Sequence, residues 1–142
     1  METLDYEVGQ IAVRGYRTSR FTFNGIEKEI INPGWYLKDD ETGIYGIYDR
    51  EDQKQIHRNI NRAKAEAFGL LLPEQIKEIR EGLGLTQEQM VMKIGGSKRS
   101  FQEYESGDTL PSQATSSLLR RLKEDPEKIN SILNFCLPTD YE

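Results

Sequence analysis

The segment of residues 85–111, LTQEQMVMKIGGSKRSFQEYESGDTLP, constrains the fold more than any other part of the chain. Thr86 followed three positions later by Gln89 forms a capping box, which predicts that a helix begins here. Met90, Val91 and Ile94 then supply an apolar face at helical spacing. The pair Gly95-Gly96 predicts the end of this helix, since glycine ends helices at little steric cost.

A second short helix is predicted directly after the glycine pair. Ser97 is the expected cap of this helix, and Phe101 and Tyr104 lie three positions apart on its inner side. Gly107 predicts its end, and Pro111 prevents immediate continuation. Two short helices joined by a tight turn, the second with a polar outer face, are typical of helix-turn-helix readers of DNA.

The predicted DNA-binding residues follow from this geometry, because the first side chains of the second helix point at base edges in such domains. Arg99 is suited to bind guanine through O6 and N7, and Lys98 to do the same or to hold a phosphate. Gln87 begins the preceding helix, where its side chain and the helix-end amides are suited to a phosphate. The full set of predicted contacts is Gln87, Ser97, Lys98, Arg99, Ser100, Gln102 and Glu103.

Glu103 is the exception among these residues because it is acidic. It can accept a hydrogen bond from cytosine N4, or orient Arg99 through an ion pair one turn away. Alternatively it repels phosphate, so that the domain binds DNA weakly or has lost that role. The sequence leaves these alternatives open.

The charge balance is unusual for a DNA-binding protein. The chain of 142 residues has a formal net charge of −5, and residues 72–142 hold nine Lys and Arg against twelve Asp and Glu. DNA binding depends largely on neutralised phosphates, so the positive charge must be concentrated locally. An acidic excess also suits a basic protein partner. The candidate cations are Lys93, Lys98, Arg99, Arg120 and Arg121.

The chain divides into a β-rich part and a helical part. RTSRFTF, Asn24-Gly25 and IEKEII predict a hairpin with a type I′ turn. We expect Asn32-Pro33-Gly34 to end its second strand and residues 35–37 to start another. A turn at residues 39–43 leads to a further strand at residues 44–48.

Helices are predicted for the remainder of the chain. Residues 49–68 are polar, with an apolar stripe of Ile56, Ile60, Ala63 and Ala67. A later helix carries Ala114, Leu118, Leu119 and Leu122 on its inner face. Asp125-Pro126 is expected to open a last helix with an apolar stripe of Ile129, Ile132, Leu133 and Phe135. This helix is our leading dimer surface, and the alternative is that it is buried within the monomer.

The predicted fold class is therefore α+β. A small N-terminal antiparallel β domain (residues 1–48) and a linker helix (residues 49–69) precede an all-α five-helix DNA-binding domain (residues 70–142). A single helix-turn-helix contacts few bases, so we expect a homodimer on a palindromic operator.

Several functions are not supported by the sequence. No apolar run approaches the roughly 18 residues that span a membrane, and the acidic start does not resemble a signal peptide. Cys136 is the single cysteine, so we expect a reducing cytoplasm. His57 is interpreted as solvated and residues 39–41 as a solvated acidic loop. No nucleophile, base or metal cluster indicates an enzyme or a cofactor.

Residues 72–133 resemble the Xre family of Cro- and lambda-repressor-like DNA-binding domains. The resemblance rests on LLPEQIKEIREGLGLTQEQ, SFQEYESGDTLPS and a following leucine-bearing helix. It implies a five-helix domain with the reader helix described above.

Both halves together resemble the MqsA-type antitoxins. GGSKRSFQEYESGDTLPS and SLLRRLKEDPEKINSI carry the specific part, and FTFNG and GWYLKDDETGIYG the looser part. The resemblance implies an N-terminal zinc domain held by two C-x-x-C pairs. The corresponding positions here are Thr3, Tyr6, Leu37 and Asp40, which cannot form such a site. We therefore expect a zinc-free relative with apolar packing in place of the metal.

The expected function is a sequence-specific transcriptional regulator, the antitoxin of a type II toxin-antitoxin pair. The resemblance implies that it represses its own operon, and that its N-terminal unit or the domain junction neutralises a small toxin. It also implies an arginine that reads bases where this chain has Glu103. The alternatives are an Xre-type regulator without a toxin partner and a protein-interaction module that has lost DNA binding.

Overall fold

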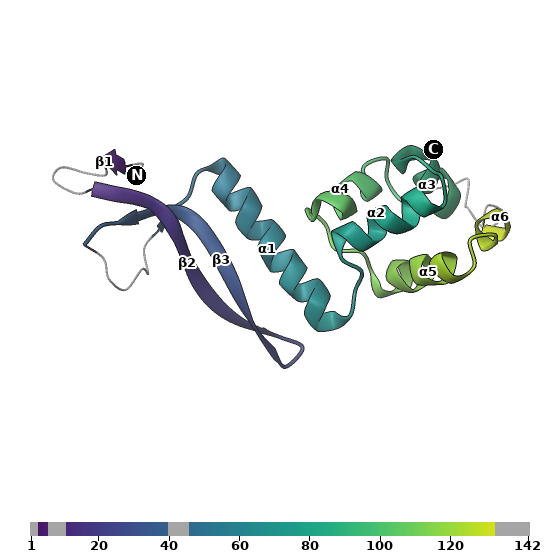
Figure 1. The fold of residues 1–142 in the computed structure, drawn as a ribbon, viewed down its shortest axis with the longest axis horizontal. Coiled ribbons are helices and arrows are strands. Elements are labelled where there is room, and N and C mark those ends of the chain that lie inside the picture. Colours follow the sequence, from purple (N-terminus) through teal and green to yellow (C-terminus); the bar gives the residue numbers. More distant parts are fainter. Residues whose placement is uncertain (1–2, 6–10, 40–45, 133–142) are drawn as a thin grey trace. The chain divides into compact units, whose positions relative to one another are not determined.

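The structure is a computed structural model that describes residues 3–5, 11–39 and 46–132 (Figure 1). The chain divides into two compact units, Met1–Ala63 and Lys64–Glu142, here called the N-terminal and C-terminal units. The division falls inside one helix, α1 (Arg50–Phe68). The first unit combines a sheet with this helix and the second is helical, so the predicted α+β class is confirmed.

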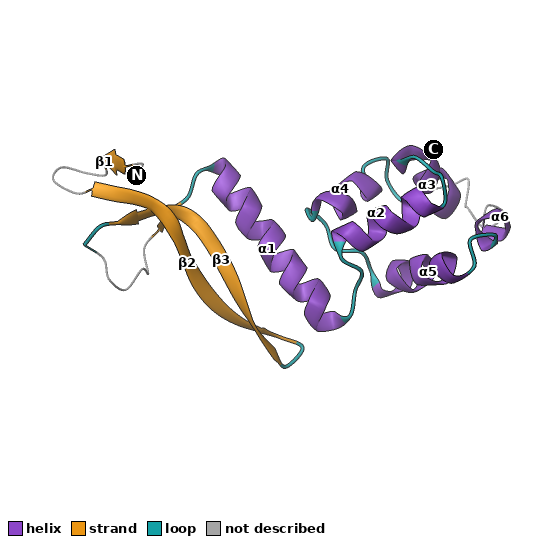
Figure 2. Cartoon of the chain, in the orientation of Figure 1, coloured by secondary structure: helices purple, strands orange, loops and turns teal. Residues whose placement is uncertain are grey.

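The N-terminal unit contains a four-stranded antiparallel sheet in the order β1-β2-β3-β4 (Figure 2). Its strands are β1 (Thr3–Asp5), β2 (Ile11–Phe23), β3 (Ile26–Leu37) and β4 (Gly46–Ile47). Phe23 pairs with Ile26 across a two-residue turn. Asn24 and Gly25 have φ values of 52° and 72°, the left-handed conformation of a type I′ turn. The predicted hairpin is therefore confirmed.

The expected end of the second hairpin strand at Asn32-Pro33-Gly34 is wrong. β3 continues through these residues to Leu37, with Pro33 opposite Tyr16 and Gly34 opposite Gly15. β4 pairs only with Trp35 and Tyr36, so β3 is an edge strand at Pro33 among the described residues. An edge position tolerates proline because no neighbouring strand needs its missing N–H group.

Helix α1 packs along the β2–β3 hairpin, as the predicted linker helix (Figure 1). The Asn59 side-chain amide donates a hydrogen bond of 2.8 Å to the carbonyl oxygen of Ile31 on β3. Ile30 and Tyr36 of β3 are buried, as is Ala63 of α1, whereas Ile56 and Ile60 are only half-buried. The apolar interior of this unit is therefore small.

Five helices follow α1 in the described part of the C-terminal unit, as predicted. They are α2 (Pro73–Gly82), α3 (Gln87–Ile94), α4 (Ser100–Ser106), α5 (Gln113–Glu124) and α6 (Lys128–Ile132). Buried apolar side chains of this unit form one cluster, and α4 is packed against the other helices through its cluster residue Phe101. The buried members of the cluster are Leu71, Ile76, Ile79, Met90, Val91, Phe101, Leu119 and Leu122.

Two details of the helical prediction are corrected. Ala114 is exposed, because it lies in the first turn of α5, and the buried residues of that helix are Ser116, Leu119 and Leu122. The Ser116 hydroxyl accepts a hydrogen bond of 3.3 Å from the backbone N–H of Leu71. The last helix begins at Lys128, after single-turn hydrogen bonds that start at Asp125, and Leu133 and Phe135 lie outside the described residues.

Within the described part of the chain, no helix is both long enough and apolar enough to cross a membrane.

Candidate nucleic-acid interface

The start of α3 is capped as the sequence predicted. The Thr86 hydroxyl accepts a 3.1 Å hydrogen bond from the Gln89 backbone N–H. The Gln89 side chain accepts one of 2.8 Å from the Thr86 backbone N–H. Gln87, the first residue of α3, is half-buried. The two reciprocal hydrogen bonds of this capping box hold the first turn of α3 in one conformation.

The turn between α3 and α4 depends on its two glycines. Gly95 and Gly96 have φ values of 89° and 111°, which side-chain-bearing residues rarely adopt. A Cβ atom at Gly96 would lie 2.9 Å from the Ser100 hydroxyl oxygen. Gly96 therefore lets the turn close directly against the start of α4.

The predicted cap Ser97 stands one turn before α4, because α4 begins at Ser100 with Arg99 as its N-cap residue. The Ser97 backbone N–H donates a 2.9 Å hydrogen bond to the Ser100 hydroxyl, and the two hydroxyls are 3.1 Å apart. The Ser100 N–H donates to the Ser97 carbonyl at 3.0 Å. These two serines hold a turn of backbone whose middle residues are Lys98 and Arg99.

The exposed side chains at the start of α4 include both positively charged ones. Lys98, Arg99 and Gln102 are exposed, whereas Ser100 is half-buried. On the opposite side of α4, Phe101 is 1% exposed and its ring meets that of Tyr104 edge-on at 5.5 Å. The apolar contacts of Phe101 hold the helix against the other helices, while Lys98, Arg99 and Gln102 are exposed to solvent.

Glu103 has a structural role at the other end of α4. Its carboxylate accepts a 3.0 Å hydrogen bond from the Thr109 hydroxyl, and its carbonyl oxygen accepts from the N–H groups of Gly107 and Asp108. In the described part of the chain the Glu103 carboxylate binds the Thr109 hydroxyl and forms no ion pair with Arg99, whose carbonyl oxygen accepts only the Glu103 backbone N–H. Glu103 secures the loop that leads from α4 toward α5.

A buried ion pair that the sequence did not predict joins α4 to α2. The Arg80 guanidinium of α2 binds the Glu105 carboxylate of α4 through two hydrogen bonds of 2.7 and 3.0 Å. The Arg80 side chain also donates to the Leu85 carbonyl at 2.8 Å. The two side chains are 13% and 6% exposed, and the hydrogen bonds to Glu105 raise the pKa of Arg80. Sequence spacing contains no signal for this pair because 25 positions separate its members.

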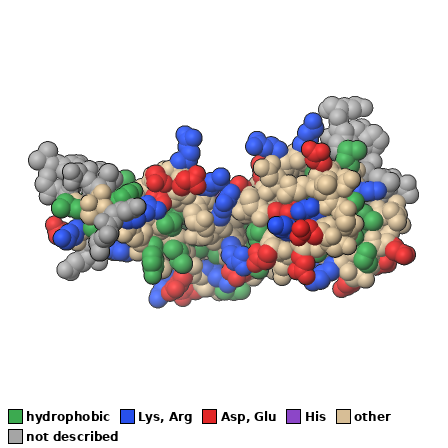
Figure 3. Space-filling view, turned by 45° about the horizontal axis from the view of Figure 1, so that its top comes forward, with side chains coloured by type: hydrophobic (Ala, Val, Ile, Leu, Met, Phe, Trp, Pro, Cys, Tyr) green, Lys and Arg blue, Asp and Glu red, His purple; other side chains and the backbone are tan. Residues whose placement is uncertain are grey.

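The other candidate cations are dispersed. Lys93 is half-buried, Arg121 is exposed, and Arg120 donates a hydrogen bond to the Gly69 carbonyl. Acidic and basic side chains lie next to one another on the face drawn in Figure 3. Local positive charge at the start of α4 therefore comes from Lys98 and Arg99.

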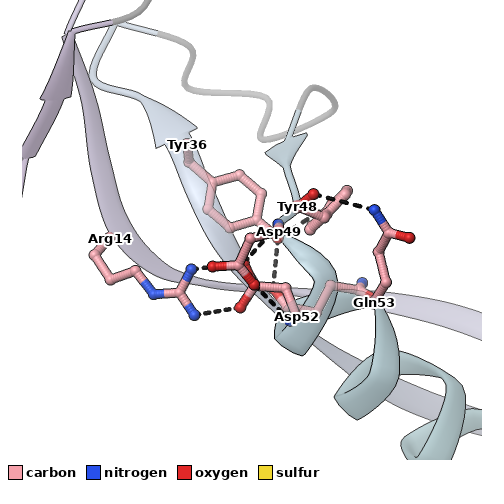
Figure 4. Close-up of polar contacts among 7 residues, drawn as sticks. Arg14, Tyr36, Tyr48, Asp49, Asp52 and Gln53 are labelled. Atoms are coloured by element: carbon pink, nitrogen blue, oxygen red, sulfur yellow. Dashed lines mark hydrogen bonds and ion pairs between the residues drawn. The ribbon is translucent and has the colours of Figure 1, made fainter.

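A second polar cluster, also missed, lies in the N-terminal unit (Figure 4). Arg14 of β2 binds both carboxylate oxygens of Asp52 on α1. Asp52 and Asp49 each accept a hydrogen bond from the other's backbone N–H, at 3.1 and 2.8 Å. The Asp52 side chain is 3% exposed, and the hydrogen bonds from Arg14 lower the pKa of its carboxyl group. The Asp49 and Asp52 spacing at a helix start was the available signal for a cap.

Two tyrosines complete this cluster. The rings of Tyr36 and Tyr48 meet edge-on at 6.2 Å, and burial raises the pKa of the Tyr36 phenol (Figure 4). A Cβ atom at Gly34 would lie 2.7 Å from the Tyr48 ring, and one at Gly46 only 2.4 Å from its hydroxyl. The Tyr48 ring therefore fills a space that two glycines leave open.

The residues at the four positions equivalent to zinc ligands do not fit zinc. Thr3 is exposed on β1 and Leu37 is half-buried on β3, and neither offers a thiolate or an imidazole. Tyr6 and Asp40 lie outside the described residues. Within the described ranges, no group of three or more His, Cys, Asp and Glu side chains is arranged to hold a metal ion. The expected apolar packing in place of the metal stays a prediction, because two of the four positions are not described.

Comparisons with known proteins agree with this architecture. The family model described as the antitoxin component of the bacterial toxin-antitoxin system, MqsA, matches residues 10–133. Antitoxin MqsA of Escherichia coli K12 is 29% identical over 133 residues, covering 84% of this chain and 91% of that protein. Vegetative-specific protein H7 of Dictyostelium discoideum is 38% identical over 50 residues, covering 35% of this chain and 48% of that protein.

Proposed function

The chain belongs to the MqsA family of antitoxins, and we propose that it represses its own operon by sequence-specific DNA binding and neutralises a small toxin. Membership in an antitoxin family agrees with the expectation of a regulatory protein rather than an enzyme. The observation that carries the DNA-binding part is the exposed set of Lys98, Arg99 and Gln102, on a helix start held by a glycine turn.

Each residue of the proposed interface has a separate task. Arg99 binds a guanine through O6 and N7, and Lys98 binds either a neighbouring guanine or a phosphate. Gln102 contacts a base edge one turn further on. Gln87 and the amides at the start of α3 hold a phosphate. Ser97 and Ser100 act mainly by holding the turn, because their hydroxyls bind each other.

We propose a homodimer on a palindromic operator, since one helix-turn-helix reads few bases. The surface formed by α5 and α6 is the proposed dimer contact. The described residues line a groove of about 250 Å³ there, and Leu118 and Leu122 supply its apolar part. Arg121, Lys128 and Ser131 form its polar rim.

The toxin partner is assigned to the N-terminal part of the chain, residues 1–48, with residues 49–69 as the linker and residues 70–142 as the DNA-binding domain. Antitoxins act by binding a toxin, and the sheet of the N-terminal unit has an exposed hairpin that the DNA-binding proposal does not use. Co-expression with the products of the two adjacent genes, followed by purification, tests for a stable complex.

A gel-shift experiment with the DNA upstream of the gene tests the repressor proposal. Arg99→Ala is expected to weaken operator binding by about 10- to 100-fold, because a bidentate guanine contact is lost. The matched control is Lys77→Ala, which removes an exposed cation from α2 without touching the proposed interface. Equal binding by the Arg99→Ala variant and the unmodified chain contradicts the proposal, provided that circular dichroism shows both folded.

Glu103→Gln distinguishes the alternatives for that residue. If Glu103 accepts a hydrogen bond from cytosine, the variant binds the operator less selectively. If Glu103 repels phosphate, the variant binds operator and unrelated DNA more tightly, since a negative charge is removed. Absence of any shift by the unmodified chain favours a module that has lost DNA binding.

A further inference from the structure

One edge of the N-terminal sheet has no neighbouring strand among the described residues. β1 pairs with β2 only from Ile11 to Val13. Residues 16–22 of β2, here called the free edge, pair with β3 on one side alone. Every residue of the free edge except Ser19 is exposed, and Tyr16 is 64% exposed. The backbone of this segment is therefore accessible from the side.

The turn geometry determines which backbone groups point outward. Phe23 and Ile26 flank a two-residue turn and form a hydrogen-bonded pair. From there along the hairpin, non-hydrogen-bonded and hydrogen-bonded pairs of residues alternate. Alternation places the N–H and C=O groups of the even-numbered residues on the outer side. These residues are Tyr16, Thr18, Arg20 and Thr22.

Two contacts agree with this assignment. The Arg17 guanidinium donates a 3.1 Å hydrogen bond to the Tyr16 carbonyl oxygen, which must therefore face away from β3. On the other strand, Ile31 lies opposite Thr18, and its carbonyl oxygen faces outward to accept from Asn59. Both partners of the Thr18–Ile31 pair thus direct their backbone groups away from each other.

The opposite edge of the hairpin is occupied. Asn59 of α1 binds the outward carbonyl of Ile31, and β4 pairs with Trp35 and Tyr36. The free edge of β2 has no such cover in the described ranges. Exposed strand edges are templates for pairing with another chain.

Building on the proposed function, we propose that the toxin docks by adding an extended segment of its own to the free edge of β2, antiparallel or parallel, as a fifth strand. Backbone hydrogen bonds to the four outward residues supply affinity in this mode, and alternate side chains supply selectivity. The toxin therefore binds at the free edge of β2, through the outward backbone N–H and C=O groups of this chain.

The chemistry of the added segment follows from the charge of β2. Residues 11–23 contain three arginines and no acidic residue. Arg14 binds Asp52, and Arg20 lies 3.7 Å from Glu27 and 3.4 Å from Glu29, whereas Arg17 is exposed and forms no ion pair with the described residues. An added strand with a carboxylate opposite Arg17 is favoured, because opposite charges across strands are stabilising. A second copy of β2 is disfavoured, since it would bring arginine-bearing strands together.

Thr18→Pro tests the edge directly. The variant removes an outward N–H and places a ring on the edge, yet breaks no β2–β3 hydrogen bond, because residue 18 occupies a non-hydrogen-bonded pair. Toxin affinity, measured on the full chain with the toxin co-purified from the adjacent genes, is expected to fall about tenfold or more. Thr18→Val, which keeps the N–H, is the matched control and is expected to bind normally.

Amide hydrogen exchange on the unmodified chain gives a second readout that does not depend on a variant folding. In the free chain, the amides of Tyr16, Thr18, Arg20 and Thr22 are expected to exchange quickly, while those of Arg17, Ser19 and Phe21 are protected. In the complex, the four outward amides are expected to slow by about tenfold or more. This alternating pattern is the signature of an added strand.

The outcomes separate this inference from the proposed function. A toxin complex in which the outward amides still exchange quickly, or to which Thr18→Pro binds undiminished, overturns the edge proposal but leaves the antitoxin function. Protection of the same amides in the chain alone, rising with its concentration, overturns it in favour of self-pairing. Failure to form any toxin complex overturns both.

Discussion

The two units of this chain are held together by different kinds of contact. In the C-terminal unit the described helices enclose a continuous cluster of eight buried apolar side chains. In the N-terminal unit a thin sheet and one helix are joined by polar contacts, the bidentate Arg14–Asp52 pair and the Asn59–Ile31 hydrogen bond, beside a few buried apolar side chains. Ala12, Ile30 and Tyr36 are the buried apolar side chains on its described strands.

This difference shows how a small unit compensates for a limited apolar core. Small domains bury a smaller fraction of their surface than large ones, so apolar packing leaves them marginally stable, and structural zinc is one common remedy. Here Thr3 and Leu37 offer no zinc ligand, and a buried carboxylate with a guanidinium partner joins sheet to helix. The stability that the Arg14–Asp52 ion pair contributes depends on the charge of its two side chains, whereas the stability of an apolar core does not.

The largest effect is expected from a cavity in the apolar cluster. Phe101→Ala removes a ring that is 1% exposed and should reduce the free energy of unfolding of the C-terminal unit by about 4 kcal/mol. Far-ultraviolet circular dichroism follows the loss of helix during denaturation. The fluorescence of Trp35, the single tryptophan, reports the N-terminal unit and should change little. A loss below about 1 kcal/mol would show that the cluster does not dominate stability.

A smaller, pH-dependent loss of stability is expected when the Arg14–Asp52 pair is broken. The folded state lowers the pKa of Asp52, so the pair stabilises the N-terminal unit above the unfolded pKa of about 3.9. This stabilisation is lost as the pH falls through the folded pKa. At neutral pH, Asp52→Asn should destabilise the unit by about 2 kcal/mol, because a charge-assisted pair is broken.

Trp35 fluorescence measures this effect well, since the Arg14 guanidinium lies 5.5 Å from the centre of the indole ring. Asp39→Asn, at an exposed position, is the control and should leave both stability and its acid dependence unchanged. If the Asp52→Asn variant unfolds in acid with the same profile as the unmodified chain, another group controls the acid response of this unit.

The smallest effect is expected from removing metal. Added EDTA should leave the Trp35 melting temperature of the N-terminal unit unchanged, because Thr3 and Leu37 offer no zinc ligand. The C-terminal unit, followed by circular dichroism in the same samples, is the internal reference. A fall in melting temperature that added zinc restores would show that other side chains bind the metal.

The parts of the fold that the sequence predicted depend on local chemistry. The capping box of Thr86 and Gln89, the glycine turn and the Asn24-Gly25 hairpin each involve residues within a few positions of one another. Helical spacing likewise identified Phe101 as core. The start of α4 was misplaced by two residues, because Ser97 heads a single turn that precedes the helix and Arg99 is the N-cap residue.

The parts that the sequence did not predict involve residues far apart in the chain. Arg80 and Glu105 look like solvated charges on two separate helices, and only their packing makes them a buried pair. Pro33 is typical of a strand end. β3 continues through it because no described strand pairs with Pro33 on the side opposite β2. The candidate reader residues were predicted as a group, whereas the contact of Glu103 with Thr109 was not.

The amino-acid sequence by itself determined where helices, turns and the hairpin begin and end, and which short segment carries the positively charged helix start. Backbone geometry and capping act over a few residues, so a linear pattern records them. Tertiary structure alone decided which charges are buried in pairs, which serines fix the turn, and which strand edge is left without a neighbour. These outcomes depend on distances between segments that the chain brings together only when it folds.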